Sequence, residues 1–288
     1  LTEMQQFSRE RPIDIAFVSM KSYDTEWATA LIKQYLAPDG YVVSLQNCLN
    51  EERIAGVVGW GKTVGMVASL ISVDMYEAGK IRRTVSKGGD KHTVFRVGEV
   101  HGRITKRVEE LREMVGMIDS AKTTTNLWGE RWSKLCQNGM KNGVSAATGM
   151  TGTDCDRNDA VRRFSIKLGG EAVRVGQALG YHIEKIGKFE PELLACAAED
   201  DKAALDEVEA ILRPGSNTNP NPRADIQRPS MAQDIIKGRR TEIEFMNGYI
   251  AERGNYIGVK APTHAKLTEI VKKVERKELM PSAALLGG

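Results

Sequence analysis

Polar side chains recur at helical spacing between Trp128 and Thr148. When this stretch is wound as a helix, at about 100° per residue, they fall on one face. They are Lys134, Asn138, Lys141, Asn142 and Ser145. The large apolar residues fall on other faces, where they suit burial. An ammonium group can donate a proton, and amides and a hydroxyl can hydrogen-bond a polar ligand. The face therefore predicts a binding or catalytic surface.

The composition of this helix favours that interpretation over a solvated face. Glu, Lys and Gln cost a helix little, whereas Asn is less favourable because its amide competes for the backbone. Here two Asn residues accompany Gly139 and Gly143, which weaken the helix further. Selection for something other than helical stability is indicated. A solvated face with incidental Asn residues is the alternative.

Lys21 and Asn47 each follow a short apolar run, Asp14–Met20 and Tyr41–Gln46. If both runs are parallel strands, the two residues lie just past carboxyl ends, where open α/β sheets place their ligand crevice. The alternatives are a solvent-exposed charge for Lys21 and a turn-forming residue for Asn47. Position alone does not decide between them.

Ser230 begins a strong helix signal that we expect to continue to Glu252. Pro229 precedes it, and Ser230 with Gln233 forms a capping-box pattern, which alone would explain the serine. Glu242 falls in the middle of an apolar stripe of this helix. The stripe consists of Met231, Ile235, Gly238, Met246 and Tyr249. A carboxylate on a buried stripe needs a partner, which is either a structural ion pair or a cationic active-site group.

The elements that would position these residues divide the chain in two. Three apolar runs, the two above and Thr63–Ile71, alternate with helical segments at about Thr25–Leu36 and Glu51–Gly56. Runs that are apolar throughout, rather than alternating, predict a parallel sheet covered on both faces. An edge hairpin of strands over Lys80–Lys87 and His92–Val97 is expected around Gly88-Gly89-Asp90, and a helix over Arg103–Met117.

After Asp119–Thr125 the strand signals almost vanish. Besides the helices over Trp128–Thr148 and Ser230–Glu252, the pattern predicts helices over Asp159–Gly180, Asp201–Leu212 and Ala265–Lys277. We therefore expect an α/β Rossmann-like domain over residues 1–121, followed by an all-α domain over residues 122–288. Between the helices, Arg213–Arg228 is rich in Pro and Asn and reads as a long loop.

Composition excludes several classes of protein. The chain has 288 residues, of which 41% are hydrophobic and 27% charged, and this is typical of a globular protein. A net charge of +3 with scattered basic residues gives no basis for nucleic-acid binding. No apolar run is long enough to span a membrane, and no signal peptide opens the sequence.

Cysteine, histidine and glycine patterns narrow the chemistry further. The four cysteines form no C-x-x-C pair, which favours reduced thiols in the cytoplasm and gives no metal site. The four histidines are isolated, so a His-centred site is not expected. The glycines of Gly56–Gly61 precede a strand, whereas a phosphate-binding turn requires the order strand, glycines, helix.

Four stretches together form a recognisable pattern. They are VSMKSYDT at Val18–Thr25, VSLQNCLNEE at Val43–Glu52, WSKLCQNGMKN at Trp132–Asn142 and RPSMAQDIIKGRRTEIEFMNG at Arg228–Gly248. With these stretches the chain resembles the ketopantoate reductase (2-dehydropantoate 2-reductase) family. The resemblance runs from about Asp14 to Lys277 and is weaker across Lys188–Arg228, where this chain carries a longer insertion. The last stretch is the most specific.

The resemblance implies NADPH-dependent reduction of a 2-keto acid to a 2-hydroxy acid, in pantothenate and coenzyme A biosynthesis, in a cleft between the two domains. By position, Lys134 would be the general acid that protonates the carbonyl oxygen as hydride arrives. The substrate-binding residues would be Asn47, Asn138, Asn142, Ser230 and Glu242. Lys21 and Asn47 would contact the nicotinamide side of the cofactor. A homodimer is one option for the assembly.

The glycine-rich first strand and turn of the family are not found in this sequence. Asp14–Met20 matches a middle strand of the Rossmann half, so we expect that a nucleotide-binding segment of roughly sixty residues, the size of two βα units, is missing before Leu1. Two alternatives remain open. One is a reductase of another 2-keto acid, and the other is a non-catalytic relative that keeps the residues for ligand recognition.

Overall fold

The computed structural model describes residues 11–71, 73–83, 85–213 and 228–287. The loop expected over Arg213–Arg228 lies almost entirely outside the described residues. The chain forms two compact units, Leu1–Arg131 and Trp132–Gly288, and each is described by itself. Among the described helices, none combines the length and the apolar character that crossing a membrane requires.

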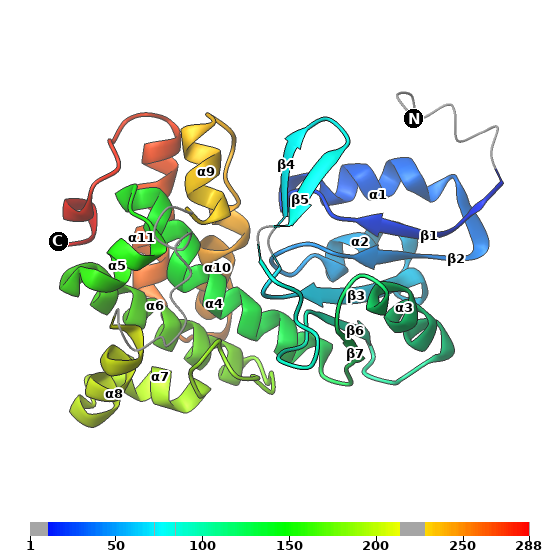
Figure 1. The fold of residues 1–288 in the computed structure, drawn as a ribbon. Coiled ribbons are helices and arrows are strands. Elements are labelled where there is room, and N and C mark those ends of the chain that lie inside the picture. Colours follow the sequence, from blue (N-terminus) through cyan, green and yellow to red (C-terminus); the bar gives the residue numbers. More distant parts are fainter. Residues whose placement is uncertain (1–10, 72, 84, 214–227, 288) are drawn as a thin grey trace. The chain divides into compact units, whose positions relative to one another are not determined.

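The first unit contains a mixed sheet (Figure 1). The strands of this sheet are β1 Ile13–Val18, β2 Leu36–Ser44, β3 Thr63–Ala68, β6 Phe95–Glu99 and β7 Ala121–Thr123. Their order is β1-β2-β3-β6-β7. The first three strands are parallel, as predicted, β6 runs antiparallel to β3, and β7 runs parallel to β6. The predicted parallel arrangement is thus confirmed for the strands that carry Lys21 and Asn47 at their ends.

Helices cover both faces of this sheet because its central strands are apolar on both sides. Val42 of β2 packs with Ile54 of α2 (Glu51–Val58) and with α1 (Thr25–Lys33). The next residue, Val43, points to the other face and packs with Leu111 of α3 (Lys106–Gly116). Successive side chains of a strand alternate between faces, so a continuous apolar run supplies two cores.

The predicted hairpin at Gly88-Gly89-Asp90 is wrong. The hairpin of this unit lies earlier, where β4 (Val73–Glu77) pairs with β5 (Lys80–Arg83) in a separate two-stranded sheet. Its turn contains Gly79 at φ +75°, a left-handed conformation that glycine adopts without strain. Gly88 instead donates its N–H to the Asp119 carboxylate at 2.9 Å. The segment expected as the second strand continues into β6, which pairs with β3.

Pro38, Asp39 and Gly40 lie at an irregularity inside β2. Pairing with β1 moves from Ile13↔Leu36 to Ile15↔Tyr41, so β2 contains extra residues between two regular stretches. A bulge of this kind accommodates a proline without ending the strand.

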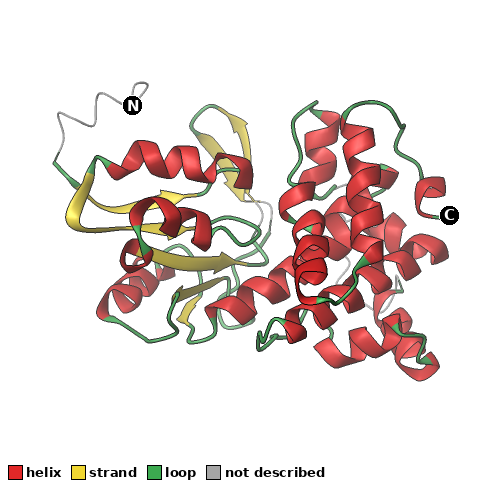
Figure 2. Ribbon diagram, turned by 180° about the vertical axis from the view of Figure 1, so that it is seen from behind, coloured by secondary structure: helices red, strands yellow, loops and turns green. Residues whose placement is uncertain are grey.

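The second unit is helical throughout its described part (Figure 2). Its helices are α4 Leu127–Thr148, which begins in the first unit, α5 Gly152–Arg157, α6 Asp159–Ala178, α7 Pro191–Ala198, α8 Lys202–Leu212, α9 Ser230–Ile236, α10 Asn247–Ile257 and α11 Pro262–Glu275. The α/β sheet followed by a helical region agrees with the expected fold class. The sequence did not predict the short helices α5 and α7.

A single helix over Ser230–Glu252 is wrong. The helix α9 ends at Ile236, the chain turns at Gly238, and a second helix, α10, begins at Asn247. Gly238 has φ +63° and donates its N–H to the carbonyl of Ile235, as a glycine does just past a helix end. The predicted apolar stripe through Glu242 therefore does not exist. Ser230 is the first residue of α9 and makes no capping bond, because the cap position belongs to Pro229.

The first compact unit ends at Arg131 and the second begins at Trp132. β7 spans the predicted domain boundary at 121/122 and pairs with β6, and the first turn of α4 packs against the sheet. Gly65 in β3 permits that packing, because a Cβ there would lie 2.4 Å from the Leu127 side chain.

Candidate active site

The carboxyl ends of β1 and β2 bring two predicted residues to neighbouring loops. The N–H of Leu45 donates to the carbonyl of Val18 at 2.9 Å, so the parallel strands leave the sheet at the same edge. Lys21 lies in the first loop and Asn47 in the second, and both are half-buried. The structure thus places them where a ligand crevice is expected. Their roles remain predictions.

Two buried amides cross-link these loops. Gln46 Nε2 donates to the carbonyl of Met20 at 2.8 Å. Asn50 Nδ2 donates to Ser22 Oγ at 3.1 Å and to the carbonyl of Asn47 at 2.9 Å. The sequence pattern gives no sign of a role for Gln46 and Asn50, because each has a partner on a different loop. The cross-links fix the backbone on either side of Asn47.

The residue after Asn47 has an unusual backbone conformation. Cys48 is buried and has φ +66°, in the left-handed region that favours glycine. Non-glycine residues are held there only when the surrounding structure enforces it, and such residues cluster at functional sites. The turn that presents Asn47 is therefore enforced by its surroundings.

The predicted polar face of α4 is present but its members differ in environment. Lys134, Asn138 and Asn142 are half-buried and follow one another at intervals of four residues, which places them on one side of the helix. Lys141 is exposed. Ser145 is buried, and its hydroxyl donates to the carbonyl of Met150 at 2.5 Å. The structure thus selects three of the five residues as candidates for ligand contact.

Glu242 lies between α9 and α10 in a segment that packs on α4. Glu242 is buried, with only 5% of its surface exposed. Asn142 Nδ2 lies 3.8 Å from Met246 Sδ, and the N–H of Met246 donates to the carbonyl of Glu242 at 3.1 Å. The side chain of Ile243 would lie 3.0 Å from a Cβ on Gly143. Glu242 therefore belongs to a segment beside the middle of α4, next to Asn142.

Ser230 is exposed at the start of α9. Just before it, Arg228 Nε donates to the carbonyl of Gly149, which follows the end of α4, at 3.1 Å. This contact joins the approach to α9 to the end of α4.

The two glycines of α4 are explained by close packing. Gly139 faces a buried pair, Asn247 and His264, and Gly143 faces Asn247 and Leu267. Asn247 Nδ2 lies 3.0 Å from the carbonyl of Gly139 and 3.1 Å from His264 Nδ1. Two features therefore account for the poor helical propensity of α4. Close packing requires the glycines on one face, and the half-buried polar residues, including the two Asn residues, lie on another.

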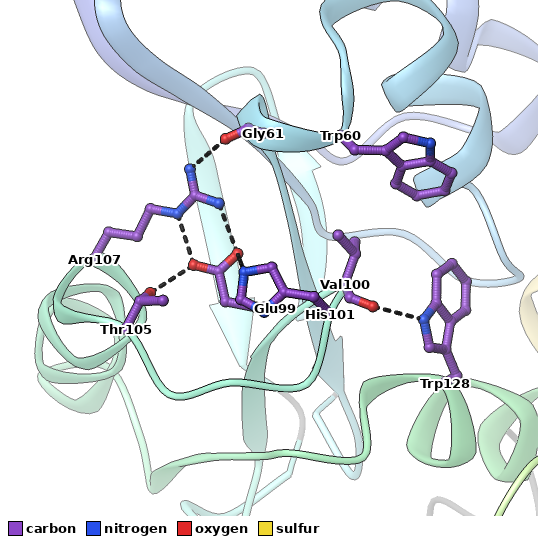
Figure 3. A pocket seen from close by; sticks show the side chains of 8 residues that line it. All are labelled: Trp60, Gly61, Glu99, Val100, His101, Thr105, Arg107 and Trp128. Atoms are coloured by element: carbon purple, nitrogen blue, oxygen red, sulfur yellow. Dashed lines mark hydrogen bonds and ion pairs between the residues drawn. The ribbon is translucent and has the colours of Figure 1, made fainter.

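An open pocket of about 550 Å³ lies elsewhere in the first unit (Figure 3). Glu99, at its base, accepts from Arg107 Nε at 2.7 Å and from Arg107 Nη2 at 2.6 Å, and Thr105 Oγ1 donates to the same carboxylate. These bonds outweigh burial and lower the pKa of Glu99, although burial, the largest single influence, raises it. The pocket lies at the amino end of β3, beside Trp60 and Trp128, whereas Asn47 follows the carboxyl end of β2.

The described residues hold no cluster of His, Cys, Asp and Glu that could bind a metal ion. Gly56 lies inside α2, and Gly59 is the residue that follows this helix. The glycines of Gly56–Gly61 therefore precede β3, as expected. They do not form a phosphate-binding turn.

An α/β unit with Lys21 and Asn47 at a parallel-strand edge, followed along the chain by a helical unit, is the arrangement expected from the family resemblance of the sequence. Family comparisons agree. The model described as "Ketopantoate reductase PanE/ApbA C terminal" matches residues 126–275, and the one described as "Ketopantoate reductase PanE/ApbA" matches residues 2–94. The chain belongs to the ketopantoate reductase family, and its relatives there are oxidoreductases.

Individual relatives are distant but cover most of the chain. The 2-dehydropantoate 2-reductase of Archaeoglobus fulgidus is 27% identical over 271 residues, which is 93% of this chain and 79% of the relative. The crystal structure of a PanE/ApbA family ketopantoate reductase from Ralstonia eutropha is similar with a TM-score of 0.72 at 23% identity, covering 94% of this chain and 79% of that one. A complex of D-mandelate dehydrogenase with NADH has the same TM-score at 18% identity, covering 92% and 79%.

Proposed function

We propose that this protein reduces 2-dehydropantoate to pantoate with NADPH, a step of pantothenate and hence coenzyme A biosynthesis in the cytoplasm. The observation that carries the proposal is the half-buried row of Lys134, Asn138 and Asn142 on α4, beside the segment that holds Glu242. The names of the relatives supply the substrate and the reaction. The four cysteines, all among the described residues, form no disulfide.

Lys134 supplies the proton in this proposal. Reduction of a ketone develops negative charge on its oxygen, and an ammonium both stabilises that charge and protonates the oxygen. The amides of Asn138 and Asn142 and the hydroxyl of Ser230 hold the keto-acid carboxylate without competing for the proton. Glu242 accepts a hydrogen bond from the distal hydroxyl of the substrate. The buried carboxylate is suited to a neutral donor of this kind.

The first unit holds the nicotinamide side of the cofactor. Lys21 and Asn47 present half-buried ammonium and amide groups at the carboxyl ends of β1 and β2, and these groups fit a ligand with a carboxamide and ribose hydroxyls. Asn47 also contacts the substrate in this proposal. When bound, the cofactor supplies the hydride. The residues of this chain orient it and deliver the proton.

A reductase of another 2-keto acid is the second candidate. The likeness to D-mandelate dehydrogenase favours it, because that fold serves a bulky 2-hydroxy acid. The difference between the two candidates depends on Glu242. A distal hydroxyl can donate a hydrogen bond to this carboxylate, whereas a substrate without a hydroxyl forgoes that hydrogen bond and its contribution to specificity.

The decisive experiment is oxidation of NADPH and NADH by the purified protein over a panel of 2-keto acids. The panel contains 2-dehydropantoate, its analogue without the hydroxyl and an aromatic 2-keto acid. We expect the highest kcat/KM for 2-dehydropantoate with NADPH, and Glu242→Gln should lower that value while changing the analogue little. Equal turnover of the analogue contradicts the assignment. Light scattering tests the expected homodimer.

A further inference from the structure

The last residue of the first unit is a buried arginine, and its side chain contacts the loop that carries Asn47. Arg131, in the first turns of α4, is only 2% exposed. Its guanidinium donates to the carbonyls of Ser44 and Gln46, both at 2.7 Å, and to Ser44 Oγ at 3.1 Å. Ser44 is the last residue of β2, and Gln46 immediately precedes Asn47. The backbone that enters Asn47 is therefore held by one side chain.

The charge of Arg131 is balanced by a carboxylate from the other end of the same loop. Glu51, the first residue of α2, is fully buried and accepts from Arg131 Nε at 2.6 Å. Its second oxygen accepts the N–H of Asn50 at 3.2 Å. The pair thus spans the loop from Ser44 to Glu51 and holds both ends. Only a guanidinium presents donors in a rigid planar fork that can bind several acceptors at once.

The loop between these two anchors contains the strained turn. Cys48 has φ +66°, and a left-handed conformation at a non-glycine residue persists only when neighbouring contacts enforce it. Asn50, whose N–H binds Glu51, also donates to the carbonyl of Asn47. The contacts of Arg131 and Glu51 therefore extend by one hydrogen bond to Asn47 itself.

We propose that Arg131 and Glu51 are positioning residues that hold the Ser44–Glu51 loop in the conformation in which Asn47 binds the nicotinamide nucleotide. This inference rests on the proposed function of Asn47. Neither residue touches the ligand. They act through the backbone carbonyls of Ser44 and Gln46 and through the side chain of Asn50.

Arg131→Lys and Glu51→Gln test the proposal, with Arg107→Lys as the matched control. The control pair is Arg107 with the buried Glu99, which is also an arginine–glutamate ion pair of the first unit but lies at the amino end of β3. A lysine keeps the charge but cannot reach all the acceptors of the guanidinium. All three variants should fold, with lowered melting temperature.

Two readouts are compared across the variants. Hydrogen exchange of the amides of residues 45–50 reports the loop, and fluorescence titration gives the Kd for NADPH. We expect Arg131→Lys and Glu51→Gln to speed exchange in this loop at least tenfold and to raise the Kd about tenfold. Arg107→Lys should leave both within about twofold of the wild type.

The outcomes separate this proposal from the proposed function. Unchanged exchange in both loop variants, or faster exchange with an unchanged Kd, overturns the positioning role. An equal effect of Arg107→Lys on both readouts also overturns it, since the effect would then be general destabilisation. A wild-type protein that includes the expected nucleotide-binding segment and still does not bind NADPH contradicts the proposed function instead, and its exchange pattern still shows whether Arg131 and Glu51 hold the loop.

Discussion

Lys134 is the residue on which the proposed chemistry depends. Replacing it with alanine removes the proton donor while leaving the buried residues of α4 in place. We expect Lys134→Ala to lower kcat by about 10²–10⁴-fold, with a smaller effect on KM, because the proton transfer occurs only in the transition state. Steady-state kinetics with 2-dehydropantoate measure both constants.

Lys141 is the control for this prediction. It lies on the same helix and was part of the same predicted face, but it is exposed. Lys141→Ala should leave kcat within about twofold of the wild type, as surface substitutions usually do. Similar losses in both variants would show that charge on α4, rather than proton donation by Lys134, supports the reaction.

Cys48 supports a prediction about stability. Its left-handed backbone is tolerated by glycine but strongly disfavoured by a β-branched residue. We expect Cys48→Val to unfold at lower denaturant than Cys48→Gly, with a difference of roughly 1–3 kcal/mol in the free energy of unfolding. Urea unfolding of the two variants measures it. A valine variant as stable as the glycine variant would mean that the turn relaxes readily.

At this scale the sequence indicated single residues better than their partners. Lys134, Asn138 and Asn142 could be found because helical period places them on one face whatever they contact. Gln46 and Arg131 could not, because their partners, which include backbone carbonyls, lie on other elements. The type of a residue does not indicate whether it makes such hydrogen bonds. Contacts of this kind become visible only when the fold brings distant segments together.

The packing of α4 gives a prediction at the level of elements. Helical propensity alone predicts that Gly143→Ala is stabilising by nearly 1 kcal/mol. The structure predicts the opposite, because a Cβ there would lie 2.9 Å from Leu267 Cδ2 and 3.0 Å from Ile243 Cδ1. We expect a loss of about 1–3 kcal/mol, as for overpacked cores, in urea unfolding.

Gly56 provides the matched substitution. It lies in α2, is exposed, and a Cβ there would meet nothing within 4 Å. Gly56→Ala should therefore stabilise the protein by about 0.5–1 kcal/mol. If both variants were stabilised, the close approach of α4 to α10 and α11 would be looser than the structure has it.

Elements with a strong period were predicted well, and elements decided by a turn were not. The helix α4 has the predicted extent to within one residue, because its apolar and polar faces persist over many turns. The expected helix over Ser230–Glu252 failed because Gly238 was counted as part of the apolar stripe. Its left-handed conformation ends the helix. In sequence, a glycine near a possible helix end is compatible both with a continuing helix and with a helix that ends there. Only tertiary packing decides between the two.

At the level of the whole molecule, two cores in the first unit follow from apolar strands, and this was visible in the sequence. The organisation of the helical unit was not. Its centre is the buried pair Asn247 and His264, whose bonds connect several helices. His264 Nε2 lies 2.8 Å from the carbonyl of Leu168 in α6, and Nδ1 lies 3.1 Å from Asn247 Nδ2 in α10. An isolated histidine in sequence gives no sign of this.

His264 makes the stability of the protein depend on pH. In the unfolded chain its pKa is ordinary, about 6.5, whereas burial in the folded protein lowers the pKa of His264 to about 4. The Glu171 carboxylate accepts the backbone N–H of His264, at 3.2 Å, whereas the ring Nε2 lies 2.8 Å from the carbonyl of Leu168. Between the two pKa values the unfolded chain binds more protons, so the free energy of unfolding rises with pH.

The stabilisation is complete above about pH 6.5 and is lost progressively as the pH falls towards 4, by on the order of 3 kcal/mol in total. His264→Gln removes the titrating ring while keeping a donor for the carbonyl of Leu168. We expect this variant to be less stable than the wild type at about pH 7 and to approach it at about pH 5. Urea unfolding of both proteins at the two pH values measures the difference. A constant difference would show that His264 does not titrate on unfolding, and that the acid sensitivity of the fold comes from its carboxylates.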